Sequence, residues 1–84
     1  MDAKMLDLVN KLATCQAKCN HCFNSCLKEK DIEMMKGCIK LDKDCSEICG
    51  IALSYLTSES SFTKEILQLC AAICQRCAHE CGQH

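Results

Sequence analysis

The chain has 84 residues, a net charge of −1 and eleven cysteines, with no proline or tryptophan and only three glycines. Acidic and basic side chains are mixed, so no basic patch marks a nucleic-acid partner, and no apolar run reaches the ~18 residues that span a membrane. The absence of proline and the few glycines favour long helices over a loop-rich fold.

Three helices are predicted, joined by short polar connections. The first runs over residues 2–27, the second over 31–56 and the third over 61–81, with Asp2 and Asp31 as N-caps of the first two. Short connections favour antiparallel neighbours. We therefore predict an all-α antiparallel helical bundle.

The N-terminus is amphipathic and contains acidic residues. It lacks the basic start, long apolar run and small-residue cleavage site of a secretory signal. We expect a cytoplasmic protein, in which thiols stay reduced.

The cysteines follow one helical spacing. In the first and third helices they recur at i, i+4, i+7 and i+11, whereas in the second helix Asp42 occupies the i+4 position. At about 100° per residue, this series stays on a stripe roughly 60° wide on one helix face. The cysteines are Cys15, Cys19, Cys22, Cys26, Cys38, Cys45, Cys49, Cys70, Cys74, Cys77 and Cys81. The spacing predicts three thiol-bearing faces that enclose a metal-binding interior.

Each thiol face continues into an apolar segment. These segments carry Met5, Leu8 and Leu12 in the first helix; Ala52, Leu53 and Leu56 in the second; and Phe62, Ile66 and Leu67 in the third. If the helices alternate in direction, the three segments meet at one end of the bundle. We expect a hydrophobic plug there and a thiol-lined mouth at the other end.

Other candidate ligands lie near the predicted mouth. Met34 and His84 continue the thiol faces of their helices, and a thioether and an imidazole suit a soft monovalent metal. Asp42 could accept a hydrogen bond, face a water-filled gap or supply an oxygen ligand. His21 and His79 are expected on the surface.

The spacing supports Cu(I) chemistry, with other interpretations open. Thiols one helical turn apart can hold a two-coordinate Cu(I) ion, and soft sulfur donors favour Cu(I), with Zn(II) the main rival. Two thiolate pairs on facing helices could also form a tetrahedral zinc site. A redox-sensing thiol protein is a third interpretation.

Several functions are disfavoured. A disulfide scaffold is disfavoured because the number of cysteines is odd and the thiols of one helix face the same way. An iron–sulfur cluster is disfavoured because four cysteines along a helix do not surround a cubic cluster. No catalytic triad or carboxylate pair is present, so we predict no enzymatic activity.

The stretches 15–26 and 70–81, together with 38–49, resemble the bacterial copper storage proteins, cysteine-rich four-helix bundles that fill their core with Cu(I). The resemblance covers nearly all of residues 1–84, which we take as one domain. It implies a bundle of the four-helix type, storage or buffering of several Cu(I) ions by core thiolates, cytoplasmic location and a homo-oligomer. A copper chaperone is a candidate partner.

The sequence departs from the family pattern after its third helix. The family usually continues into a fourth cysteine-bearing helix, whereas this sequence stops at His84. The fourth helix is then either absent or supplied by another subunit, and one side of the thiol interior should be uncovered.

Overall fold

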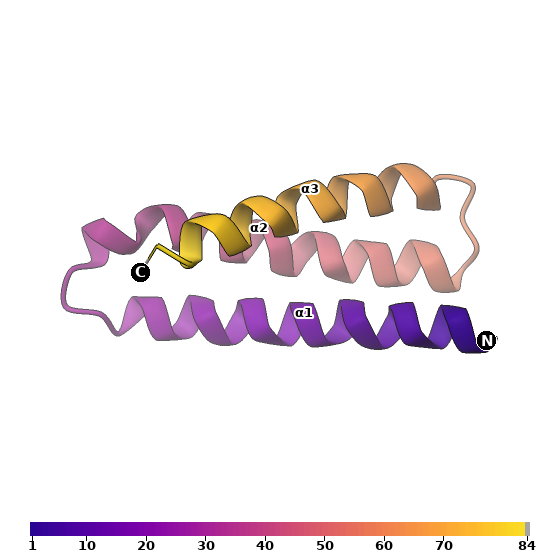
Figure 1. Ribbon diagram of the computed structural model, residues 1–84, viewed down its shortest axis with the longest axis horizontal. Helices are drawn as coiled ribbons and strands as arrows, with labels where there is room; N and C mark the ends of the chain where they lie inside the picture. Colours follow the sequence, from indigo (N-terminus) through magenta and orange to yellow (C-terminus); the bar gives the residue numbers. More distant parts are fainter. Residues whose placement is uncertain (84) are drawn as a thin grey trace.

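The computed structural model describes residues 1–83. Within that range the chain forms the helices α1 (Ala3–Leu27), α2 (Ile32–Thr57) and α3 (Thr63–Cys81), and no strand (Figure 1). The helix bounds differ from the predicted ones by two residues or fewer, and the all-α class is confirmed. None of these helices combines the length and apolar character that a membrane span requires.

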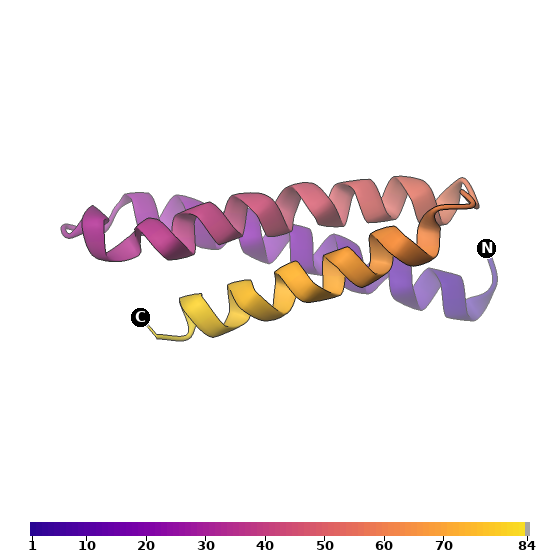
Figure 2. The ribbon, with the colours of Figure 1, turned by 90° about the horizontal axis from the view of Figure 1, so that it is seen from above.

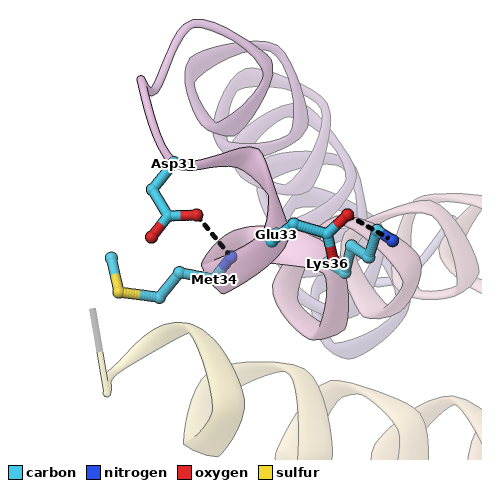
Figure 3. Close-up of polar contacts among 4 residues, drawn as sticks. All are labelled: Asp31, Glu33, Met34 and Lys36. Carbon is cyan, nitrogen blue, oxygen red and sulfur yellow. Dashed lines mark hydrogen bonds and ion pairs between the residues drawn. The ribbon is translucent and has the colours of Figure 1, made fainter.

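The predicted aspartate caps fix the starts of the first two helices. An Asp2 carboxylate oxygen accepts a hydrogen bond from the Met5 backbone N–H at 2.8 Å. Asp31 does the same for Met34 at 3.2 Å, and Glu33 and Lys36 form an ion pair in the first turn of α2 (Figure 3). Each carboxylate satisfies one of the backbone donors that a helix N-terminus leaves unpaired.

The helices alternate in direction, and α2 is central. The turn between α2 and α3 lies at the same end as the N-terminus, whereas the connection between α1 and α2 lies at the end near the C-terminus (Figure 1). Both α1 and α3 pack against α2, and Figure 2 shows α3 inclined to it. Within residues 1–83, no Cα of α1 lies within 8 Å of a Cα of α3. Therefore α1 and α3 pack on α2 side by side, with a gap between their backbones.

The apolar segments meet at one end, as predicted. Leu12 of α1 and Ala52 of α2 are buried there, and Leu8, Leu56 and Ile66 pack against the same cluster. The placement of Phe62 in this plug is wrong, because its side chain is 64% exposed. Phe62 precedes the first residue of α3, so the helical phase that turns Ile66 inward does not extend to it.

Polar contacts outside the thiol face align α1 with α2. Gln16 donates a hydrogen bond to the Ser46 carbonyl at 3.1 Å, and the Ser46 hydroxyl donates to the Asn20 side chain at 2.6 Å. A Cβ added at Gly50 would lie 2.8 Å from the Gln16 amide nitrogen, so glycine leaves room for this side chain. These contacts set the axial position at which the two thiol series face each other.

Candidate metal centre

The cysteine side chains face the interior. Cys49 is fully buried, and Cys38 and Cys45 are 1% exposed. The other cysteines are buried or half-buried, and none is exposed. The inward orientation predicted from the spacing is therefore observed on all three helices. Whether these sulfurs ligate metal remains a prediction.

A deep group of sulfurs joins the three helices near the middle of the bundle. Cys15 of α1 lies 3.8 Å from both Cys45 of α2 and Cys74 of α3, measured between Sγ atoms. Cys45 and Cys74 are 3.0 Å apart, and Cys49 lies 3.8 Å from Cys74. We call Cys15, Cys45, Cys49 and Cys74 the deep set, whose four sulfurs all lie within 4.8 Å of one another.

One sulfur of the deep set belongs to a second group. Cys45 also lies within 4.8 Å of Cys19 and Cys77, so these three sulfurs form a triangle that spans all three helices. On the opposite side of the deep set, the Cys70 sulfur lies 3.8 Å from the Cys49 sulfur and extends the series. The sulfurs thus form a continuous series rather than isolated sites, and Cys45 is a common member.

A separate group lies nearer the end of the bundle that contains the α1–α2 connection. Cys22 and Cys26 of α1 lie 3.9 Å apart, and Cys38 of α2 lies 3.8 Å from the first and 3.7 Å from the second. Asp42 completes the group, with its Oδ2 3.6 Å from the Cys38 sulfur. We call Cys22, Cys26, Cys38 and Asp42 the mouth set.

Asp42 is a buried carboxylate among thiols. Its side chain is only 1% exposed, and it accepts a hydrogen bond from the Cys77 thiol at 3.2 Å. Its Oδ1 also lies 3.5 Å from the Cys81 sulfur. Of the three roles left open for this residue, the structure shows the hydrogen bond and leaves an oxygen positioned among candidate ligands.

The expectation that every thiol is free is wrong for one pair. Cys38 and Cys81 form a disulfide, and the other nine cysteines are free. Thiols on one face of a single helix cannot pair with one another, but this bond joins α2 to α3. Their Cα atoms are 5.0 Å apart, within the separation of about 4.4–6.8 Å that disulfides usually span. Both residues could ligate metal only after reduction.

An open groove of about 540 Å³ runs between α1 and α3. Cysteines of all three helices line it, together with Asp42, and the exposed side chains of Lys11 and Lys18 border it. This groove is the uncovered side of the thiol interior that three helices were expected to leave. It gives a metal ion direct access to the sulfurs.

Burial raises the pKa of most of the free thiols, and neighbouring thiols and Asp42 add to the effect. The pKa of Cys22 rises to about 12 and that of Cys70 to about 11. The pKa is raised in Cys19, Cys22, Cys45, Cys49, Cys70 and Cys77. These thiols are protonated at neutral pH, so a metal ion must displace their protons.

Cys15 behaves differently. Burial alone would raise its pKa, but hydrogen bonds from Cys45, Cys49 and Cys74 to its sulfur outweigh this effect and lower the pKa. Cys15 lines the groove. Its surroundings therefore favour the thiolate, the form of cysteine that can ligate a metal ion.

The predicted position of Met34 on the thiol face is wrong. Met34 is 57% exposed, and its side chain extends away from α2 (Figure 3). Met35 is 7% exposed instead and packs against Cys26 and Cys38. Most of the buried positions of α2 are separated by alternating steps of three and four residues, and this series includes Met35. The spacing therefore predicts that Met35, and not Met34, faces the interior.

The histidines give no ligand in the part of the chain described. His21 and His79 are exposed, as predicted, and His79 contacts the Gln83 side chain at 3.1 Å. His84, the other predicted ligand, lies outside the described residues.

Comparison with known proteins shows where this arrangement recurs. A sequence model of the family described as Csp, copper storage protein, matches residues 1–84. The "Uncharacterized cysteine-rich protein YhjQ" of Bacillus subtilis (strain 168) is 47% identical over 70 residues, which are 83% of this chain and 65% of that protein. The chain thus spans less than two thirds of the length of this curated relative.

A solved structure is also similar. "Cu(I)-bound Copper Storage Protein BsCsp3" aligns with a TM-score of 0.88 and 42% sequence identity. The alignment covers 93% of this chain and 74% of that one. The three helices described above therefore have the arrangement of helices in that structure.

Proposed function

Because the chain belongs to the copper storage protein family, we propose that it binds and stores or buffers Cu(I) through thiolates that line its interior. The observation that carries the proposal is the continuous series of sulfurs, in which Cys45 belongs to two candidate sites. A shared thiolate can bridge two ions, so the series favours several ions in one cluster. Thiolates are soft donors, which favour Cu(I).

Zinc is the rival for the deep set. With Zn–S bonds of about 2.3 Å, a tetrahedral site has sulfurs about 3.8 Å apart, which matches several distances in this set. Cys45, however, also belongs to the triangle with Cys19 and Cys77, so the deep set is not an isolated four-sulfur site. A closed zinc site would leave the remaining thiols without a role, so we favour Cu(I).

In the proposed function the copper ions are stored, and the protein catalyses no reaction. All eleven cysteines are candidate ligands once Cys38 and Cys81 are reduced, and His84 stays a predicted additional ligand. We place the protein in the cytoplasm, with a copper chaperone as its source or recipient of metal. We also propose that a fourth helix or another subunit of a homo-oligomer covers the groove between α1 and α3, which would shield the loaded interior from solvent.

Anaerobic titration of the reduced protein with Cu(I) against a chromophoric chelator tests this function. We expect several tightly bound equivalents per chain, and fewer in unreduced protein, where Cys38 and Cys81 are bonded. Because most of the free thiols must lose protons, binding should release protons and weaken as the pH falls from about 8 to about 6. Zn(II) titration is the control. Tight binding of one equivalent of Cu(I) or less would contradict storage.

A further inference from the structure

The mouth set differs from the deep set in both packing and composition. Cys26, Met35 and Cys38 form a second buried cluster, with Cys22 and Ile39 packed against it, and Cys81 packs against both this cluster and the main core. The mouth set has four members and includes a carboxylate, whereas the deep set contains only sulfur.

The spacing of the mouth set matches a tetrahedral zinc site. With Zn–S bonds of about 2.3 Å and a Zn–O bond of about 2.1 Å, the tetrahedral edges are about 3.8 Å between sulfurs and about 3.6 Å between sulfur and oxygen. The three sulfur–sulfur distances among Cys22, Cys26 and Cys38 are 3.7–3.9 Å, and the distance from Cys38 Sγ to Asp42 Oδ2 is 3.6 Å. These distances are those of the disulfide-bonded form, in which all four ligand atoms lie within 4.8 Å of one another.

The donor types point to the same ion. Cu(I) prefers soft sulfur donors, whereas zinc accepts carboxylate oxygen together with thiolate. Three thiolates and one carboxylate fill a four-coordinate zinc shell and leave no open position, as in structural zinc sites. We propose that the reduced chain binds one Zn(II) ion through Cys22, Cys26, Cys38 and Asp42, the candidate group that combines three thiolates with a carboxylate.

This site requires the Cys38–Cys81 disulfide to be opened. Two low-molecular-weight thiols supply the two electrons: they are oxidised to their disulfide while Cys38 and Cys81 become thiols. Zn(II) then binds the thiolates of Cys22, Cys26 and Cys38, and the protons of these three thiols go to solvent. Zinc and the disulfide exclude each other, so zinc binding should slow reoxidation of Cys38.

Zinc at the mouth would link α1 to α2 while copper is scarce. The ligands come from one helix turn of α1 and one of α2, next to the connection between them. Cu(I) at high supply would compete for the same three thiolates. The proposal concerns zinc alone and does not depend on copper storage.

Titration of reduced, metal-free protein with Zn(II) against a chromophoric chelator tests the site, with Co(II) as a spectroscopic probe. We expect one tight equivalent and an X-ray absorption shell of three sulfurs and one oxygen. Asp42→Asn keeps the size of the side chain and removes its charge, and should weaken Zn(II) affinity by more than about 10-fold, the smallest loss typical even of outer-shell changes. Asp44→Asn makes the same change at an exposed position of α2 and should leave the affinity unaltered.

A second variant guards against misfolding of Asp42→Asn. Asp42→Cys restores the missing thiol of the helical series and should retain zinc with a shell of four sulfurs and an altered Co(II) spectrum. The proposal is overturned if wild-type protein binds no Zn(II) tightly, or if its zinc shell already contains four sulfurs. Unchanged affinity in Asp42→Asn, or an unchanged shell in Asp42→Cys, would overturn it equally. Because no copper is present, none of these results bears on Cu(I) storage.

Discussion

Loading the reduced chain with Cu(I) should raise its thermal midpoint by more than about 15 °C. A ligand that binds only the folded state adds about 4 kcal/mol at a free concentration ~1,000 times its Kd. One kcal/mol shifts the Tm of a domain of this size by about 4–8 °C. The sulfurs that bind the ion belong to three helices, so each ion also cross-links helices that little hydrophobic core holds together.

Circular dichroism under anaerobic conditions measures this shift. Addition of a strong Cu(I) chelator should return the midpoint to that of the metal-free protein, and Mg(II) at the same concentration should have no effect. A midpoint that stays within a few degrees after several equivalents have bound would show that copper binds outside the interhelical thiols.

Replacing Cys45 by alanine should lower copper capacity about twice as much as replacing Cys49 by alanine, because Cys45 belongs to two candidate sites and Cys49 to one. Both residues are buried, and both substitutions remove one sulfur from the same core. Their costs in folding stability should therefore be similar, and the difference should appear in metal binding. Cys45 lies 3.0 Å from Cys74 and 3.8 Å from Cys15, so its loss removes a sulfur of α2 that contacts both α3 and α1.

Copper content measured by elemental analysis after gel filtration of loaded protein compares the two variants. Thermal unfolding of both metal-free forms is the control for folding. Equal losses in the two variants would contradict a bridging role for Cys45 and would indicate independent sites.

The helices and their inward faces could be predicted because they depend on local pattern. Asp2 and Asp31 precede amphipathic segments, and the cysteine spacing matches the helical repeat, so the caps and the thiol faces follow from the sequence alone. The predicted inward positions of Phe62 and Met34 are wrong. Each lies at a helix start, where a shift of one or two residues changes which side chain faces inward.

The groups within the interior could not be predicted, because they depend on how far one helix is displaced along another. The sequence places Cys38 and Cys81 on inward faces but does not bring their Cα atoms to 5.0 Å, and it does not single out Cys45 as a shared member. Contacts such as that between Gln16 and Ser46 set this displacement, and they lie outside the thiol pattern. The role of Asp42 depends on which thiols of α2 and α3 surround it, and the cysteine spacing does not determine this.

Anomalous diffraction at the copper absorption edge, from crystals of reduced and Cu(I)-loaded protein, tests the central claim most directly. The account predicts several copper peaks inside the bundle, each next to two or more sulfurs from the series that includes Cys15, Cys45 and Cys74. Copper found only at exposed side chains such as His21 and His79, with the interior sulfurs free of metal, would contradict it.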